Sequence, residues 1–320
     1  MRILALVPGG IGDQVLFFPT LATLKQTYPN AQIDVVVEPR SQGAYRVCNT
    51  VSTVIPFNFR DRNSLADWGN LLGMLRDRQY DIAMSLGKSW GVAVLLWMTG
   101  TPIRIGYASR GAMFLTNPVP LNPDQYAACM YHDLLQGLGI TTPCPPLAIS
   151  IPKTDLDWAE QEQKRLELPA TGYVIIHGGS SRVAKEKGII RTYTVEGWQR
   201  VISDFQAKQP TLPIVLIQGP DDAEFVSAMV DKFPTLKTTA PDNIGQLAAM
   251  IAGANLMLCT DSAPMHLAVA VQTYVLGLFG PTSPAKSLPQ SDKVAAVVSP
   301  TGNVADIDPE AILAKVWGQS

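Results

Sequence analysis

The chain has 320 residues, 47% of them hydrophobic and 16% charged, which is enough apolar material for one large or two medium-sized cores. A formal net charge of −2 excludes a broad basic surface for nucleic acid. The four cysteines include no C-x-x-C pair, which indicates reduced thiols rather than disulfides or zinc. Because no apolar run is long enough to span a bilayer, we expect a cytoplasmic protein.

The first part of the chain alternates short apolar strands with helices. Strands are expected at 2–7, 33–38, 53–57, 81–86 and 103–107, and helices at 13–27, 64–78, 89–98 and 124–138. The helix at 89–98 contains the run VAVLLWM, which is apolar enough to contact the inner membrane surface as a peripheral protein does, but burial explains it more simply. Continuous apolar strands separated by helices predict a parallel sheet covered on both faces.

The proline-rich segment 141–155 interrupts this alternation and predicts a linker between two domains, 1–152 and 153–320. Beyond it, strands are expected at 173–177, 213–218, 236–239, 256–260 and 274–279. Helices are expected at 155–167, 195–208, 221–233, 243–252, 263–271 and 308–317. The fold class is therefore α/β, with two doubly wound, Rossmann-like domains. In such sheets ligands bind at the carboxyl ends of the strands, so we expect a cleft between the domains to hold the site.

A glycine-rich turn follows the first strand, in the stretch PGGIGD. Gly10 and Gly12 resemble part of a dinucleotide-binding fingerprint, and Glu38 ends the second strand where a ribose-binding acid would lie. However, Val15 replaces the third glycine, and the Asp13 carboxylate would repel a pyrophosphate at this helix start. Asp13 is suited to capping the helix, a role that is compatible with service as a general base.

The segment TDSAPMH at 260–266 begins where another strand ends. The backbone N–H groups of Ser262 and Ala263 would lie at a helix N-terminus, which is a ready site for an anion. His266 lies one turn into that helix, and His177 ends another predicted strand. Two of the three histidines in the chain therefore fall at strand ends, which favours a functional site over a buried core histidine.

A basic segment at 182–191 lies between these two regions. Arg182, Lys185, Lys187 and Arg191 form the local concentration of positive charge near the predicted site, which favours a phosphate clamp. The triplets DLD at 155–157 and DID at 306–308 resemble metal-binding acidic motifs, but both fall at predicted helix starts, where acids stabilise the helix dipole. No metal and no cofactor are expected.

The motifs GGIGDQVLFFPTLATLK, HGGSS…RTYTVEGW and TDSAPMHLAVAV…GLFGPTSP together resemble the ADP-heptose:lipopolysaccharide heptosyltransferase family, glycosyltransferase family 9. The resemblance covers nearly the whole chain. It implies a GT-B fold, with the acceptor on the first domain and the nucleotide sugar on the second. It also implies an inverting, metal-independent transfer to a lipopolysaccharide or other cell-surface glycan, in which Asp13 is the general base.

The resemblance also implies roles for residues of the second domain. Ser180, Ser181 and Arg191 match residues near the donor phosphates, with arginine standing where the family has lysine. Glu224 matches a ribose-binding acid, and Asp261 a residue that holds sugar or ribose hydroxyls. The Ser262 and Ala263 amides would receive the diphosphate beside His266, although the family commonly has glycine in place of Ala263.

Four alternatives remain open from the sequence. The segment RVAKEKGII is longer than in heptosyltransferases, so the donor can be a nucleotide sugar other than ADP-heptose. A nicotinamide-dependent oxidoreductase and a catalytically silent sugar-nucleotide-binding protein are the alternatives from other classes. Lys185 or Lys187 can replace Arg191 as the phosphate ligand.

Overall fold

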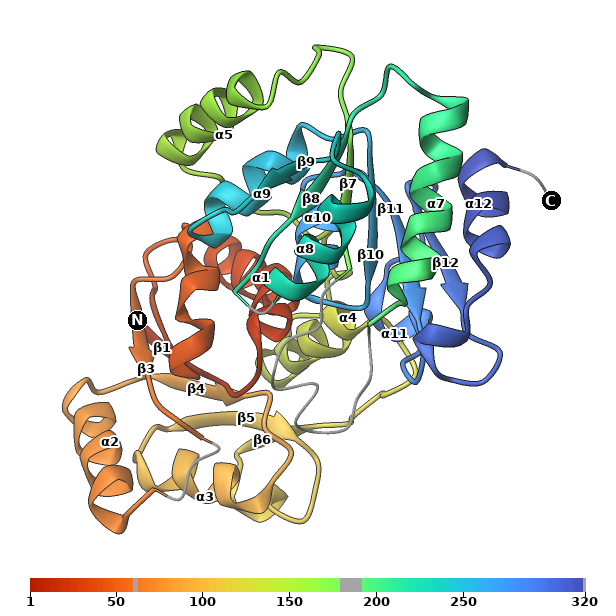
Figure 1. Cartoon of the computed structure of the whole chain (residues 1–320). Helices are drawn as coiled ribbons and strands as arrows, with labels where there is room; N and C mark the ends of the chain where they lie inside the picture. Colours follow the sequence, from red (N-terminus) through yellow and green to blue (C-terminus); the bar gives the residue numbers. More distant parts are fainter. Residues whose placement is uncertain (60–62, 179–191, 221, 319–320) are drawn as a thin grey trace. The chain divides into compact units, whose positions relative to one another are not determined.

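The computed structural model describes residues 1–59, 63–178, 192–220 and 222–318. The chain divides into two compact units, residues 1–150 and 151–320 (Figure 1). Each unit is built around its own six-stranded parallel sheet. Consecutive parallel strands must be joined by a crossover connection, usually a helix. The alternation of strands and helices in the sequence predicts such connections.

The sheet of the first unit has the strand order β3-β2-β1-β4-β5-β6. Its strands are β1 (Arg2–Val7), β2 (Gln32–Val37), β3 (Thr53–Pro56), β4 (Ile82–Ser85), β5 (Ile103–Tyr107) and β6 (Asn117–Val119). The order reverses between β1 and β4, which both lie in the middle of the sheet. Ligand sites of doubly wound sheets occur at this reversal.

Helices cover both faces of this sheet. On one face, α2 (Leu65–Asp77) and α3 (Trp90–Met98) pack against Leu4 and Leu6 of β1. Elsewhere in the unit, α1 (Ile11–Thr27) packs against α4 (Ala127–His132) and the 3-10 segment η1 (Pro39–Val47). Two further 3-10 segments, η2 (Ala112–Phe114) and η3 (Asp133–Leu138), contact β5.

The second unit repeats the same topology, with the strand order β12-β11-β10-β7-β8-β9. Its strands are β7 (Val174–His177), β8 (Ile214–Ile217), β9 (Lys237–Thr239), β10 (Leu256–Thr260), β11 (Tyr274–Phe279) and β12 (Val294–Val298). Here the reversal lies between β7 and β10, where His177 is in register with Cys259. The ends of these two strands therefore meet at one point of the sheet edge.

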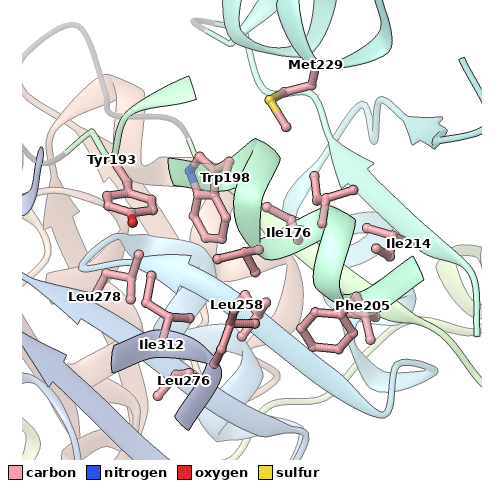
Figure 2. Packing of buried hydrophobic residues seen from close by; sticks show 14 of the residues in the cluster. Ile176, Tyr193, Trp198, Phe205, Ile214, Met229, Leu258, Leu276, Leu278 and Ile312 are labelled. Carbon is pink, nitrogen blue, oxygen red and sulfur yellow. The ribbon is translucent and has the colours of Figure 1, made fainter. Parts of the chain in front are cut away.

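The hydrophobic core of the second unit lies between its sheet and three helices, α7 (Val195–Lys208), α8 (Ala223–Lys232) and α12 (Pro309–Trp317). Figure 2 shows Trp198 and Phe205 of α7 packed over sheet residues such as Ile176 and Leu258. The remaining helices are α5 (Lys153–Arg165), α9 (Ile244–Ala252), α10 (Ala263–Ala270) and α11 (Pro284–Ser287), with η4 (Val304–Asp306) before α12. Of these, α9 packs against α5 and α10.

The fold agrees with the α/β prediction and also contains elements that the sequence does not predict. These are strands β6 and β12, each at one edge of its sheet, helix α11 and the 3-10 segments η1, η2 and η4. The helix expected at 124–138 is a short α-helix that continues as η3. The helix expected at 89–98 is only partly buried. Ala93, Leu95 and Leu96 are buried, whereas Trp90 and Trp97 are exposed. Among the described helices, none is both long and apolar enough to cross a membrane.

Candidate functional site

Asp13 lies in the first turn of α1, directly after the glycine turn that ends β1. Its Oδ2 accepts a hydrogen bond from the Gly10 N–H at 2.8 Å, and its Oδ1 accepts one from the Tyr131 hydroxyl at 2.9 Å. Gly10, not Asp13, is therefore the N-cap residue, and Asp13 reaches back from the third helical position to the N–H before the helix. Each carboxylate oxygen can accept a further hydrogen bond, and Asp13 remains partly exposed, so capping leaves the carboxylate able to contact a substrate hydroxyl.

The glycine turn allows this geometry because it lacks side chains. A Cβ atom on Gly9 would lie 2.4 Å from Asp13 Oδ2, well inside van der Waals contact. The Ser41 hydroxyl donates to the Gly9 carbonyl at 2.7 Å, which fixes the turn from η1. Gly10, the residue before α1, has ordinary extended backbone angles. Close approach of the carboxylate, rather than a left-handed backbone, is therefore the physical reason for the glycine at position 9.

Buried hydrogen bonds hold the start of α1 in place. The side chain of Gln14 donates to the Val7 carbonyl at 2.9 Å and accepts from the Tyr45 hydroxyl at 2.8 Å. Both side chains are buried, so these hydrogen bonds form in a region of low dielectric and are costly to break. The helix start is thus anchored to the end of β1 and to η1.

Helix α4 supplies Tyr131. Burial, followed by the negative charge of Asp13, raises the pKa of the Tyr131 phenol well above its ordinary value, so the hydroxyl stays protonated and donates. The next residue, His132, is buried with its Nε2 2.9 Å from the Thr23 hydroxyl of α1. Desolvation lowers the pKa of His132 and favours the neutral ring. Two successive residues of α4 therefore bind to α1.

In the second unit, His177 and Ser262 meet at the strand reversal. His177 ends β7, and Ser262 follows β10 and precedes α10. The Ser262 Oγ lies 3.4 Å from His177 Nδ1, and the Asp222 Oδ2 lies 3.5 Å from His177 Nε2. Asp222 precedes α8 and also accepts from the Gly219 N–H at 2.9 Å. The His177 ring therefore joins the starts of α8 and α10.

Ser262 and Pro264 define the N-terminus of α10. Ser262 stands at the N-cap position, but its hydroxyl donates to the Thr260 carbonyl at 3.1 Å instead of capping the helix. Pro264 at the second helical position has no N–H to satisfy. The Met265 N–H donates to the Ser262 carbonyl at 3.1 Å, and no side chain caps the helix start at Ala263, which suits an anion there.

The other predicted residues of this unit are divided between buried and exposed positions. Asp261 and His266 are buried, whereas Glu224 is exposed in the first turn of α8. Ser180, Ser181 and Arg191, together with Lys185 and Lys187, lie outside the described residues. The structure brings Asp261, Ser262, Ala263 and His266 to one end of β10 and the start of α10.

Sequence reasoning missed Gly9, Tyr131 and Asp222, which lie beside Asp13 or His177. Asp222 could have been found from the stretch QGPDD after β8, because this stretch resembles the glycine-rich turn and aspartate that follow β1. Tyr131 carries none, since it lies in no motif. In the part of the chain that the structure describes, no group of three or more histidine, cysteine, aspartate or glutamate residues could hold a metal ion.

One family model and several known proteins are similar to this chain. The model of glycosyltransferase family 9 (heptosyltransferase) matches residues 68–316. The Arabidopsis thaliana photosynthetic NDH subunit of subcomplex B 1, chloroplastic, is 25% identical over 96% of this chain and 71% of its own. Escherichia coli lipopolysaccharide heptosyltransferase 3 is 26% identical over 85% of this chain and 81% of its own.

A solved structure gives the same fold. The E. coli heptosyltransferase WaaC with ADP-2-deoxy-2-fluoro heptose superimposes with a TM-score of 0.77 and 18% identity, over 100% of both chains. At 18% identity this similarity shows the fold of the chain but not its activity. The fold is GT-B, with two Rossmann-like domains.

Proposed function

Because this chain belongs to glycosyltransferase family 9, we propose that it moves a heptose or related sugar from a nucleoside-diphosphate donor to a lipopolysaccharide or other cell-surface glycan. The general activity, glycosyl transfer, follows from the family. The donor, the acceptor and inversion of the anomeric centre are the proposal. Lipopolysaccharide heptosyltransferase 3 among the relatives and the ADP-sugar analogue in the WaaC structure support a heptose donor carried by ADP.

The observation that carries the proposal is the setting of Asp13. Its carboxylate is oriented by the Gly10 N–H and the Tyr131 hydroxyl but remains partly exposed. In a single displacement, Asp13 accepts the proton of the acceptor hydroxyl while that oxygen attacks the anomeric carbon. The bond to the nucleoside diphosphate breaks, and the leaving group takes the bonding electrons. This base role requires a positioned carboxylate within hydrogen-bond reach of the acceptor.

The second unit supplies groups suited to the donor. The uncapped start of α10 can receive the leaving diphosphate, while Asp261 is suited to sugar or ribose hydroxyls. Ser180, Ser181 and Arg191 complete the donor set in this proposal, with Glu224 on the ribose and His266 beside the sugar. We assign acceptor binding to the first unit, near Gly10 and Gly12, and donor binding to the second. The reaction needs no metal, because backbone amides and cations carry the diphosphate charge.

Transfer by the Asp13→Asn variant tests the proposal. We expect transfer to fall by on the order of 10²–10⁴-fold while the affinity for nucleoside diphosphate stays unchanged, and we expect wild-type transfer to survive EDTA. Asp67→Asn is the matched control. Asp67 is the third residue of α2, as Asp13 is of α1, and its carboxylate accepts a hydrogen bond from the Ser64 N–H at 2.8 Å. Near-wild-type transfer by folded Asp13→Asn would refute the role of Asp13.

One relative favours a second candidate function. The plant protein is named as a subunit of a larger assembly, and the similarity covers almost this whole chain. A non-catalytic chain of this kind would bind a nucleoside diphosphate or sugar nucleotide without turning it over. Titration with nucleoside diphosphates, followed by assays for donor hydrolysis and transfer, separates the two candidates. The nicotinamide-dependent alternative is not favoured by the family match.

A further inference from the structure

Helix α3 exposes an apolar stripe. Trp90 and Trp97 are 65% and 54% exposed, and Met98, next to Trp97, is also exposed. Positions separated by seven and eight residues fall on one side of a helix. The opposite side, with Leu95 and Leu96, is buried in the core cluster that includes Leu4 and Leu6 of β1. A helix that is apolar on all sides is normally buried throughout, so the exposed side of α3 requires an explanation.

Segment η2 extends this stripe into a patch. The rings of Trp97 and Phe114 lie 5.8 Å apart between centroids, which joins η2 to the C-terminal end of α3. At the other end, a Cβ on Gly111 would lie 3.0 Å from the Trp90 Cα, so the chain before η2 touches the start of the helix. Met113 of η2 is 83% exposed. We call Trp90, Trp97, Met98 and Met113 the tryptophan patch.

The chain segment that forms the tryptophan patch carries only positive charges. Residues 82–123 contain Lys88, Arg104 and Arg110 but no aspartate or glutamate, although the whole chain has a net charge of −2. Lys88 and Arg110 are exposed, and each lies within two residues of the contact between Trp90 and Gly111. Arg104 donates to the Phe114 carbonyl at 2.9 Å. Apolar side chains and cations therefore share one surface.

We propose that the tryptophan patch docks onto an anionic lipid bilayer. Tryptophan is enriched where a protein meets the headgroup region, because its ring is apolar and its N–H can remain hydrated. Cations beside such side chains are attracted to anionic headgroups, and methionine adds a flexible apolar contact. The absence of acidic residues from 82–123 favours a negatively charged surface over a protein partner of mixed charge. The inference concerns a surface and does not depend on the proposed reaction.

Flotation of the full chain with lipid vesicles tests the proposal. We expect the protein to float with vesicles of mixed phosphatidylglycerol and phosphatidylcholine, and more weakly with phosphatidylcholine alone. Trp90→Ser with Trp97→Ser should weaken partitioning by about tenfold or more. Lys88→Gln with Arg110→Gln keeps the apolar side chains and should weaken it about fivefold for each charge removed.

Matched controls separate the patch from general effects. Leu65→Ser removes an apolar side chain that is 92% exposed on α2, and Lys153→Gln with Lys164→Gln removes two exposed cations of α5. Both controls should partition like the wild type. The proposal is overturned if the patch variants bind vesicles as the wild type does. It is equally overturned if the wild type does not bind vesicles. A dimer that the tryptophan variants abolish, without vesicle binding, would show that the patch binds a second copy of the chain instead.

Discussion

Tyr131 donates a hydrogen bond to Asp13 across 118 residues of sequence. The bond joins α4 to the start of α1 and uses one of the two carboxylate oxygens. A donor to a carboxylate restricts where that group points, so Tyr131 orients the proposed base.

Tyr131→Phe should therefore lower kcat for transfer while leaving the affinity for nucleoside diphosphate unchanged. A hydrogen bond to a charged group is worth about 1.5–3 kcal/mol, so we expect a loss of roughly tenfold or more. Tyr107→Phe is the control, since its hydroxyl donates to the Met130 carbonyl at 2.9 Å instead. Equal losses in the two variants would mean that Tyr131 serves only to stabilise the unit.

Gly9→Ala should reduce transfer because the new Cβ would lie 2.4 Å from Asp13 Oδ2 and displace the carboxylate. Overpacking of this kind costs about 1–3 kcal/mol of stability, and we expect kcat to fall by at least about tenfold. Gly43→Ala in the same unit meets no atom within 4 Å and should behave as the wild type. Chemical denaturation and steady-state kinetics measure the two effects. Unchanged kcat in Gly9→Ala would show that the carboxylate position is not critical.

The contact between His177 and Ser262 predicts non-additive effects on ligand binding. If the ring acts through the serine hydroxyl, His177→Ala should weaken nucleoside diphosphate binding in the wild type but much less in a Ser262→Ala background. Contacting residues typically show coupling of about 0.5–3 kcal/mol. Calorimetric titration of both single variants and the double variant measures this coupling. Strictly additive losses would show that His177 acts independently of Ser262.

The buried Glu162 should make stability depend on pH. Two hydrogen bonds from Arg165, each 2.7 Å long, and one from the Thr239 hydroxyl hold its pKa below the ordinary value of 4.5. The carboxylate is thus more readily ionised in the folded chain than in the unfolded chain. Its stabilisation is fully present above about pH 4.5 and is lost as the pH falls through the lower, folded pKa.

Glu162→Gln should consequently destabilise the protein by about 1 kcal/mol at neutral pH, a value discounted for the exposure of Arg165. The difference from the wild type should shrink as the pH falls below the ordinary carboxyl range. Glu167→Gln, at a side chain that is 87% exposed, is the control and should change little. Urea unfolding at several pH values gives the comparison. A penalty that does not vary with pH would assign the effect to packing.

The sequence predicted the central strands well because they are continuous apolar runs, as in Arg2–Val7 and Leu256–Thr260. The edge strand β6 escaped prediction because Asn117 and Pro118 disfavour strands on local grounds, and tertiary pairing with β5 overrides that preference. The sequence places Asp13 at a helix start because such signals are local, but its bond to the preceding Gly10 N–H differs from the capping that it predicts. Its bond to Tyr131 was not predicted, since no periodic pattern relates residues so far apart.

The edge strands have a consequence for the behaviour of the protein at high concentration. An edge strand exposes unpaired backbone groups that can recruit another chain and start aggregation. Three of the four edges are short and carry a protective residue, namely Pro56 in β3, Pro118 in β6 and Lys237 in β9. The fourth edge, β12, reads VAAVV and has neither a proline nor a charge. Intermolecular pairing during storage or refolding should therefore begin at β12.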